Sequence, residues 1–345
     1  MAGINGSMAH LSDGLFTTAI AVYALAMVGY TAEYAFGRVG RKVEAGPAEA
    51  VVEPAHELVG AGGPPVSIDG LGPAAGSDTA SLPATGPTPP RFAERIGRWS
   101  VVVTVLAALV HTSSIAVRAI AVDAVPWSNM YEFSSVAGLV GVVAFLGVIW
   151  RLPALRYLGG FILLPVILMM FLAGTVLYSR AQPLVPALQS YWLAIHVTLV
   201  SIAEGALMTS AVLTVLYLVK SRHDKSAYRS ERLANLAAKL PAAETLDKAA
   251  YRVVAFSFPL YTVAIICGAI WAEAAWGRYW GWDPKETWAF IVWVVYASYL
   301  HARATAGWKG RTAAWINLAG FGAITFNFFI VNMVVSGLHS YAGLS

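Results

Sequence analysis

Long apolar segments separated by polar connections are the main feature of the sequence. A helix needs about 20 mostly apolar residues to cross the hydrocarbon core of a membrane. By this measure the sequence predicts eight spans, at residues 15–36, 99–121, 133–150, 157–178, 191–219, 253–272, 286–302 and 312–336. The pattern predicts an all-α polytopic integral membrane protein.

The composition agrees with this fold class. Hydrophobic residues make up 58% of the chain and charged residues only 12%, whereas a soluble domain has about 25% charged residues. The net charge of +4 comes from basic residues in short connections rather than on a soluble face, so we expect no nucleic-acid binding. The single cysteine, Cys267, allows no internal disulfide, and any thiol chemistry must come from a partner.

The positions of Lys and Arg predict how the helices are oriented. Connections that stay in the cytoplasm are enriched in these residues. In an eight-span arrangement one side holds all 23 Lys and Arg residues except Arg118, Arg180, Arg278 and Lys285. We therefore expect both termini and residues 273–285 to be extracytoplasmic, and the protein to lie in the plasma membrane.

Three regions follow from the pattern. Residues 1–36 form an N-terminal transmembrane helix, residues 37–98 a cytoplasmic linker, and residues 99–345 the main membrane domain. The linker is expected to be largely disordered, because residues 43–90 are rich in Ala, Gly, Pro, Ser and Thr. Residues 226–250 mix charge with spaced Leu and Ala, which predicts a short helix that is either bound to the membrane surface or solvated.

The connection after the sixth span is unusually rich in tryptophan. Residues 271–288 contain five Trp and one Tyr, whereas an aromatic belt accounts for one or two Trp at a helix end. Aromatic rings spaced by small residues can form a flat apolar platform that suits a porphyrin. Arg278 or Lys285 would then meet one of its carboxylates.

Two histidines are expected at the level of this connection. His196 lies near the outer end of the fifth span, and His339 follows the outer end of the eighth. Histidine is a common haem ligand, so the pair is suited to bis-axial ligation, although each could also be an interfacial residue bonded to a neighbour. His301 closes the seventh span at the opposite, cytoplasmic end.

Two other polar residues lie within spans. His111 is in the middle of the second span, where a hydrogen bond between helices is the favoured interpretation. Glu204 lies two turns from His196 and is either a proton relay or the partner of another polar residue.

Residues 276–288 read Trp-Gly-x-Tyr-Trp-x-Trp-Asp-Pro-Lys-Glu-Thr-Trp. This string resembles the WWD signature of haem-handling cytochrome c assembly proteins. Residues 128–133, 190–197 and 337–341 are similar to segments of the CcsA (ResC) family in particular. The resemblance covers about residues 100–345 in order, with a weaker match over the first span and none over 43–90.

This resemblance implies residues that contact haem b. His196 and His339 would be the outer iron ligands, within an extracytoplasmic haem-binding loop. His301 would bind haem entering from the cytoplasm, together with a histidine of a CcsB (ResB) partner. The residues that would hold the ring and the loop are Trp276, Trp280, Trp282 and Asp283.

The resemblance also implies an activity. The protein would help move haem to the outer face and present it to the C-x-x-C-H motif of apocytochrome c, as a subunit of a cytochrome c haem lyase (synthase) complex. Thiol-reducing proteins would be further partners. One alternative is the WWD haem-delivery protein of the other bacterial maturation pathway. Others are a transporter of another solute, which would not explain the tryptophans, and an electron carrier with haems between paired histidines deep in the membrane.

Overall fold

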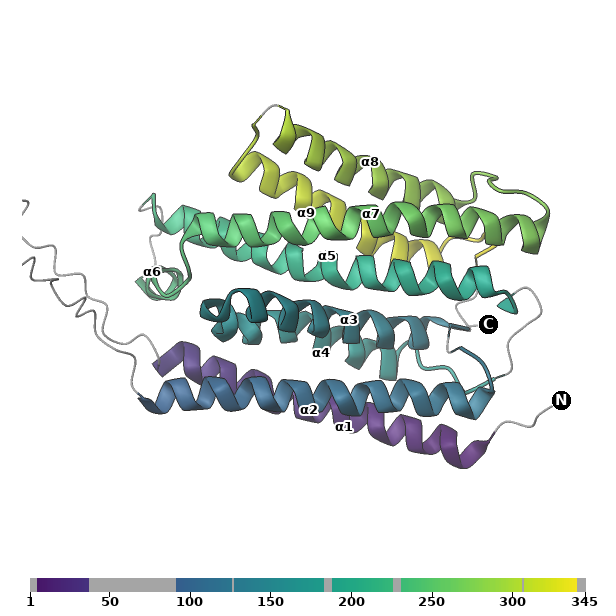
Figure 1. The fold of residues 1–345 in the computed structure, drawn as a ribbon, viewed down its shortest axis with the longest axis horizontal. Helices are drawn as coiled ribbons and strands as arrows, with labels where there is room; N and C mark the ends of the chain where they lie inside the picture. The colour runs from purple at the N-terminus through teal and green to yellow at the C-terminus, as the bar shows by residue number, and fades with distance from the viewer. Residues whose placement is uncertain are drawn as a thin grey trace, which may run out of the picture.

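The structure, a computed structural model, describes residues 5–36, 91–125, 127–182, 188–225, 231–305 and 307–339. Most of these residues lie in helices that run side by side (Figure 1). Residues 37–90 of the predicted linker lie outside the described residues. The helices are α1 (Gly6–Phe36), α2 (Arg91–Val122), α3 (Met130–Arg151), α4 (Gly159–Thr175), α5 (Tyr191–His223), α6 (Glu231–Ala238), α7 (Ala243–Trp276), α8 (Pro284–Ala304) and α9 (Arg311–Phe326), with the 3-10 helix η1 (Pro153–Leu158) and the π-helical turn η3 (Asn327–Val331).

The predicted fold class is confirmed. Among the described residues, 7 helical segments are long and apolar enough to cross a membrane. The remaining predicted span corresponds to α8, which has 21 residues. Its Trp and Tyr residues and its polar ends lower its hydropathy, yet it lies alongside α7 and α9 (Figure 1). The chain is therefore a polytopic membrane protein, and the start of α1 and the end of the described chain lie at one end of the bundle (Figure 1).

Helices α1, α2 and α7 begin earlier than their predicted spans, and α1 does so at Gly6 rather than 15. Helix α2 starts at Arg91 rather than 99, so residues 91–98 are helical although the pattern assigns them to the linker. Helix α7 starts at Ala243 rather than 253. The extra turns of α2 and α7 carry ion pairs at (i, i+4) spacing, from Arg98 to Glu94 and from Lys248 to Glu244, each at 2.6 Å. Such pairs stabilise helix beyond the apolar segment.

The bundle consists of two groups of helices. Helices α1–α4 form one group and α5, α7, α8 and α9 the other, and α3 contacts α5 where the groups meet (Figure 1). A side chain at Gly205 of α5 would put its Cβ 2.7 Å from the Ala137 carbonyl oxygen of α3. Small residues allow such close packing of membrane helices, so Gly205 sets the distance between the groups.

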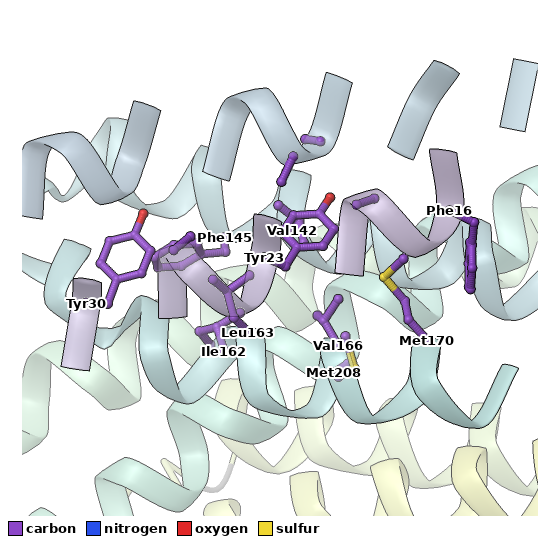
Figure 2. Packing of buried hydrophobic residues seen from close by; sticks show 14 of the residues in the cluster. Phe16, Tyr23, Tyr30, Val142, Phe145, Ile162, Leu163, Val166, Met170 and Met208 are labelled. Atoms are coloured by element: carbon purple, nitrogen blue, oxygen red, sulfur yellow. The ribbon is translucent and has the colours of Figure 1, made fainter. Parts of the chain in front are cut away.

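Aromatic and branched side chains fill the core of the first group. Tyr23 and Tyr30 of α1 are fully buried with Phe145 of α3 and Leu163 of α4 (Figure 2). The Tyr30 and Phe145 rings meet edge to face, with centroids 5.9 Å apart. This packing holds α1–α4 together on one side of the site described below.

A buried ion pair fixes the start of α3. Arg118 of α2 and Glu132 of α3 are 2% and 3% exposed, and the Arg118 Nε atom lies 3.0 Å from Glu132 Oε1. The other Glu132 oxygen accepts hydrogen bonds from the Ser128 backbone and hydroxyl, and Asn129 caps the helix. This pairing explains the residue types at 128–133 and holds that segment in place.

We expect Gly205→Val to separate the two groups. Overpacking a tight interface costs about 1–3 kcal/mol, so the variant should unfold at a lower temperature in detergent. Gly147→Val is the matched control, because a Cβ at Gly147 of α3 meets no atom within 4 Å. Equal thermal stability of the two variants would contradict the assigned contact.

Candidate functional site

A cavity lies at the end of the bundle that holds the connection between α7 and α8. Its volume is about 180 Å³, and residues of both helix groups line it. Most of its walls are apolar, and a few polar side chains face it, as is typical of ligand sites. Its apolar lining includes Phe133, Leu188, Leu193, Val197, Val200, Ile265 and Phe328.

His196 lines the cavity from α5. Its Nδ1 atom lies 2.7 Å from the Ala264 carbonyl oxygen of α7. A carbonyl only accepts, so Nδ1 carries the hydrogen and the Nε2 atom carries the lone pair. The imidazole lies nearly parallel to the Trp271 ring, at 6.4 Å and 13°. A Cβ at Gly268 would come within 2.7 Å of His196 Nδ1, so this glycine leaves the space that the imidazole occupies.

His339 lines the same cavity from the segment after η3. Its Nδ1 atom lies 2.9 Å from Asp283 Oδ2, which again assigns the lone pair to Nε2. Its ring meets Trp271 and Trp276 edge to face, with centroids 5.8 and 4.9 Å apart. Burial lowers the pKa of His339, and the Asp283 carboxylate offsets only part of that effect. The imidazole is therefore neutral at pH 7, as a metal ligand must be.

Asp283 is the N-cap of α8, and its carboxylate connects the loop before α8 with the first turn of that helix and with the C-terminal segment. It accepts hydrogen bonds from the backbone N–H of Lys285 at 3.3 Å and of Leu338 at 2.8 Å, as well as from His339. Burial raises the pKa of Asp283, but the hydrogen bonds outweigh this and the pKa is lowered overall. Glu286 completes a capping box, since its Oε2 accepts from the Asp283 backbone N–H at 3.0 Å.

The tryptophan-rich segment is only partly a loop. Residues 271–276 belong to α7 and residues 284–288 to α8, so the loop itself is limited to residues 277–283. Trp280 lines the cavity. Trp282 is 65% exposed and lies outside the lining residues. It has a φ of 57°, a value that bulky residues rarely adopt, and its ring meets Trp280 edge to face at 5.7 Å.

The structure thus brings together most of the predicted site residues. His196, His339 and Trp280 line one cavity, and Trp276 and Asp283 contact His339. His301 is exposed near the far end of α8, roughly 24 Å along the helix from Lys285. Beside it, Arg303 makes a bidentate ion pair with Asp247, at 2.7 and 2.9 Å.

Several lining residues were not expected from the sequence. Trp127 faces the cavity from the segment before α3, and Asn327 from the π-helical turn. A π-helical turn often marks a functional site, but it has no clear signal in the sequence. The capping box at the start of α8, in contrast, does have a signal in the sequence, because the Asp-Pro-Lys-Glu string has the residue types of such a box.

His111 and Glu204 have different environments. The His111 side chain is fully buried, with its Nε2 atom 2.9 Å from the Ser135 hydroxyl and Nδ1 3.5 Å from the Tyr23 hydroxyl. The predicted hydrogen bond between helices is confirmed. Glu204 lines the cavity, so it belongs to the site.

The fold and the site define a polytopic membrane protein with a tryptophan-lined cavity into which two oriented histidines project. Residues 99–339 match the family model described as cytochrome C assembly protein. The chain belongs to this family, and as a member it takes part in cytochrome c biogenesis.

Proteins named cytochrome c biogenesis protein CcsA are similar to this chain. The Guillardia theta protein is 38% identical over 257 residues, which cover 70% of this chain and 85% of the relative. The Gloeobacter violaceus protein is 34% identical over 289 residues, with the same shares. The Synechococcus elongatus protein is 39% identical over 199 residues, 47% of this chain and 61% of the relative.

We expect Asp283→Ser to release the C-terminal segment without unwinding α8. Serine is a good N-cap, but its single oxygen cannot also serve Leu338 and His339. Loss of a hydrogen bond to a charged group should speed hydrogen exchange at the Leu338 amide by about 10- to 100-fold. Hydrogen-exchange mass spectrometry of residues 332–339 measures this rate.

Glu273→Ser is the control, because Glu273 is an exposed acid near the same end of the bundle. Its exchange pattern over 332–339 should equal that of the unaltered chain. Unchanged protection in Asp283→Ser would show that Asp283 does not hold the segment.

Proposed function

We propose that the chain binds haem b in this cavity and presents it for covalent attachment to apocytochrome c. The observation that carries the proposal is the orientation of the two histidines. Each donates its Nδ1 hydrogen to a fixed oxygen, from Ala264 or Asp283, so each Nε2 carries a lone pair. This arrangement is typical of histidines that bind metals, because the second hydrogen bond fixes the ring and its tautomer.

Each group of residues has a distinct part in this function. His196 and His339 would hold the iron from two segments, while Trp280 and the apolar walls would cover the ring and exclude water. Asp283 would fix the tautomer of His339, with the lone pair at Nε2, and hold its ring in place. Haem supplies the iron and the vinyl groups that react with cysteine thiols. The protein would contribute mainly by positioning.

The proposal also includes the side of the membrane on which the cavity lies and the partners of the chain. The asymmetry of Lys and Arg favours an extracytoplasmic cavity in the plasma membrane, where apocytochrome c with its C-x-x-C-H motif receives haem. Cys267 is buried in α7, so the thiols must come from the apocytochrome, kept reduced by thiol-reducing proteins.

His301 fits an inner site shared with a partner subunit. It is exposed at the end of α8 opposite the cavity. A CcsB-like membrane subunit would supply the second histidine. Haem would then enter near His301 and reach the cavity afterwards.

Replacing either cavity histidine should change the haem spectrum. We expect His196→Ala and His339→Ala each to reduce haem retention by about tenfold or more, since even the indirect partners of a metal ligand are worth that much. Haem that stays bound should be five-coordinate, and added imidazole should restore six-coordination by filling the open position. Absorption spectra of the purified protein measure both effects.

His10→Ala is the matched control, because His10 is exposed in α1 at the same end of the bundle. It should keep the unaltered spectrum. If both cavity variants keep a six-coordinate spectrum without imidazole, the assigned ligands are wrong.

His301→Ala should lower haem content at the inner site and in the cavity, because His301 lies earlier on the proposed path. The measurement is haem content per chain after purification with the partner subunit. His223→Ala is the control, since His223 ends α5 at the same end of the bundle as His301. Normal loading of His301→Ala would leave His301 as an interfacial residue only.

A further inference from the structure

The cavity contains one positively charged side chain from α8. Lys285, the second residue of that helix, lines the cavity, and its Nζ atom donates to the Asn327 carbonyl oxygen at 3.3 Å. Among the described residues, no carboxylate lies within 4 Å of Nζ. Glu204 lines the same cavity and acts on Lys285 only from a greater distance.

An ammonium in a mostly apolar cavity is costly unless an anion neutralises it. Lys285 has two N–H groups beyond the one directed at Asn327, since an ammonium has three donors. The walls near it also have other unused polar groups. The Trp127 indole N–H is buried, and within the described residues it has no hydrogen-bond partner. Asn327 is 3% exposed, and its side-chain oxygen likewise has no partner there.

These groups are suited to one kind of ligand group, a hydrogen-bond acceptor with a negative charge. Trp127 and Lys285 both donate hydrogen bonds, and the amide of Asn327 can present either its NH₂ group or its oxygen. A carboxylate is an acceptor with two oxygens and one negative charge, so it can take several donors and neutralise the ammonium. The donors therefore favour an anionic group of a ligand whose remaining surface is apolar.

Arg278, the other basic residue of the tryptophan-rich segment, is placed differently. Its Nη1 atom lies 3.6 Å from Glu286 Oε1, so a carboxylate of the protein already neutralises it. It is also not among the residues that line the cavity. The sequence left both residues as candidates, and the contacts separate them.

We propose that Lys285 is the carboxylate-binding residue of the cavity, with Trp127 and Asn327 as neighbouring polar contacts. The inference rests on the proposed haem binding, because it names the part of the ligand that Lys285 recognises. It assigns the cavity a preference for a porphyrin with free carboxylates over one whose carboxylates are esterified.

The test compares iron protoporphyrin IX with its dimethyl ester. Both are titrated into the full-length chain in lipid nanodiscs, and binding is followed by absorption spectra. The unaltered chain should bind the free acid about 10- to 100-fold more tightly than the ester, as expected for a hydrogen bond to a charged group. Lys285→Gln should lose that preference while the bound haem keeps its six-coordinate spectrum.

Arg278→Gln is the matched control, because it removes a positive charge from the same segment outside the cavity. It should keep the preference for the free acid. Protection of the Leu338 amide from exchange shows that each variant is folded around Asp283. Lys285→Arg restores the charge and should recover part of the preference.

Three outcomes would overturn the inference. Lys285→Gln could keep the full preference for the free acid, or it could lose both ligands equally. Arg278→Gln could lose the preference instead, which would assign the carboxylate to Arg278. Failure of the unaltered chain to bind either porphyrin is a different result, because it would overturn the haem proposal and this inference with it.

Discussion

The carboxylate of Asp283 is the interaction on which the site depends. One side chain begins α8, holds the C-terminal segment through Leu338, and sets the tautomer of His339. Hydrogen bonds to an ionised acceptor are stronger than neutral ones, and these share a buried carboxylate that is 8% exposed. The start of a helix, the end of the described chain and a proposed metal ligand are thus fixed by the same two oxygens.

A second buried carboxylate, that of Glu132, orders the part of the other helix group that lines the cavity. Glu132 pairs with Arg118 and orders the segment that carries Trp127 into the cavity. A buried ion pair adds little net stability, because its charges lose their hydration. It does, however, hold one geometry, since leaving either charge unpaired in the membrane would cost several kcal/mol. Each group therefore brings its wall of the cavity to a fixed position.

Apolar segments predicted the helices well but not their ends. Hydropathy reports contact with lipid, whereas α2 and α7 continue through turns stabilised by the pairs Arg98–Glu94 and Lys248–Glu244. The common level of His196 and His339 followed from topology alone. The orientation of single rings could not be predicted from topology. Trp282, for example, has a φ of 57° and an exposed side chain. Arg278 and Lys285 look alike in the sequence, and only their contacts distinguish them.

Helix α8 relates the two ends of the molecule. Lys285 lies in its first turn and His301 in its last, roughly 24 Å apart along a straight helix. Between them, Val292, Tyr296 and Tyr299 are almost fully buried against α5, α7 and α9. That face of α8 is packed protein, so the cavity does not extend along it toward His301. The cavity and His301 are therefore separated by the packed length of α8, and the proposed movement of haem between them requires either a route along another face or a change in how α8 packs.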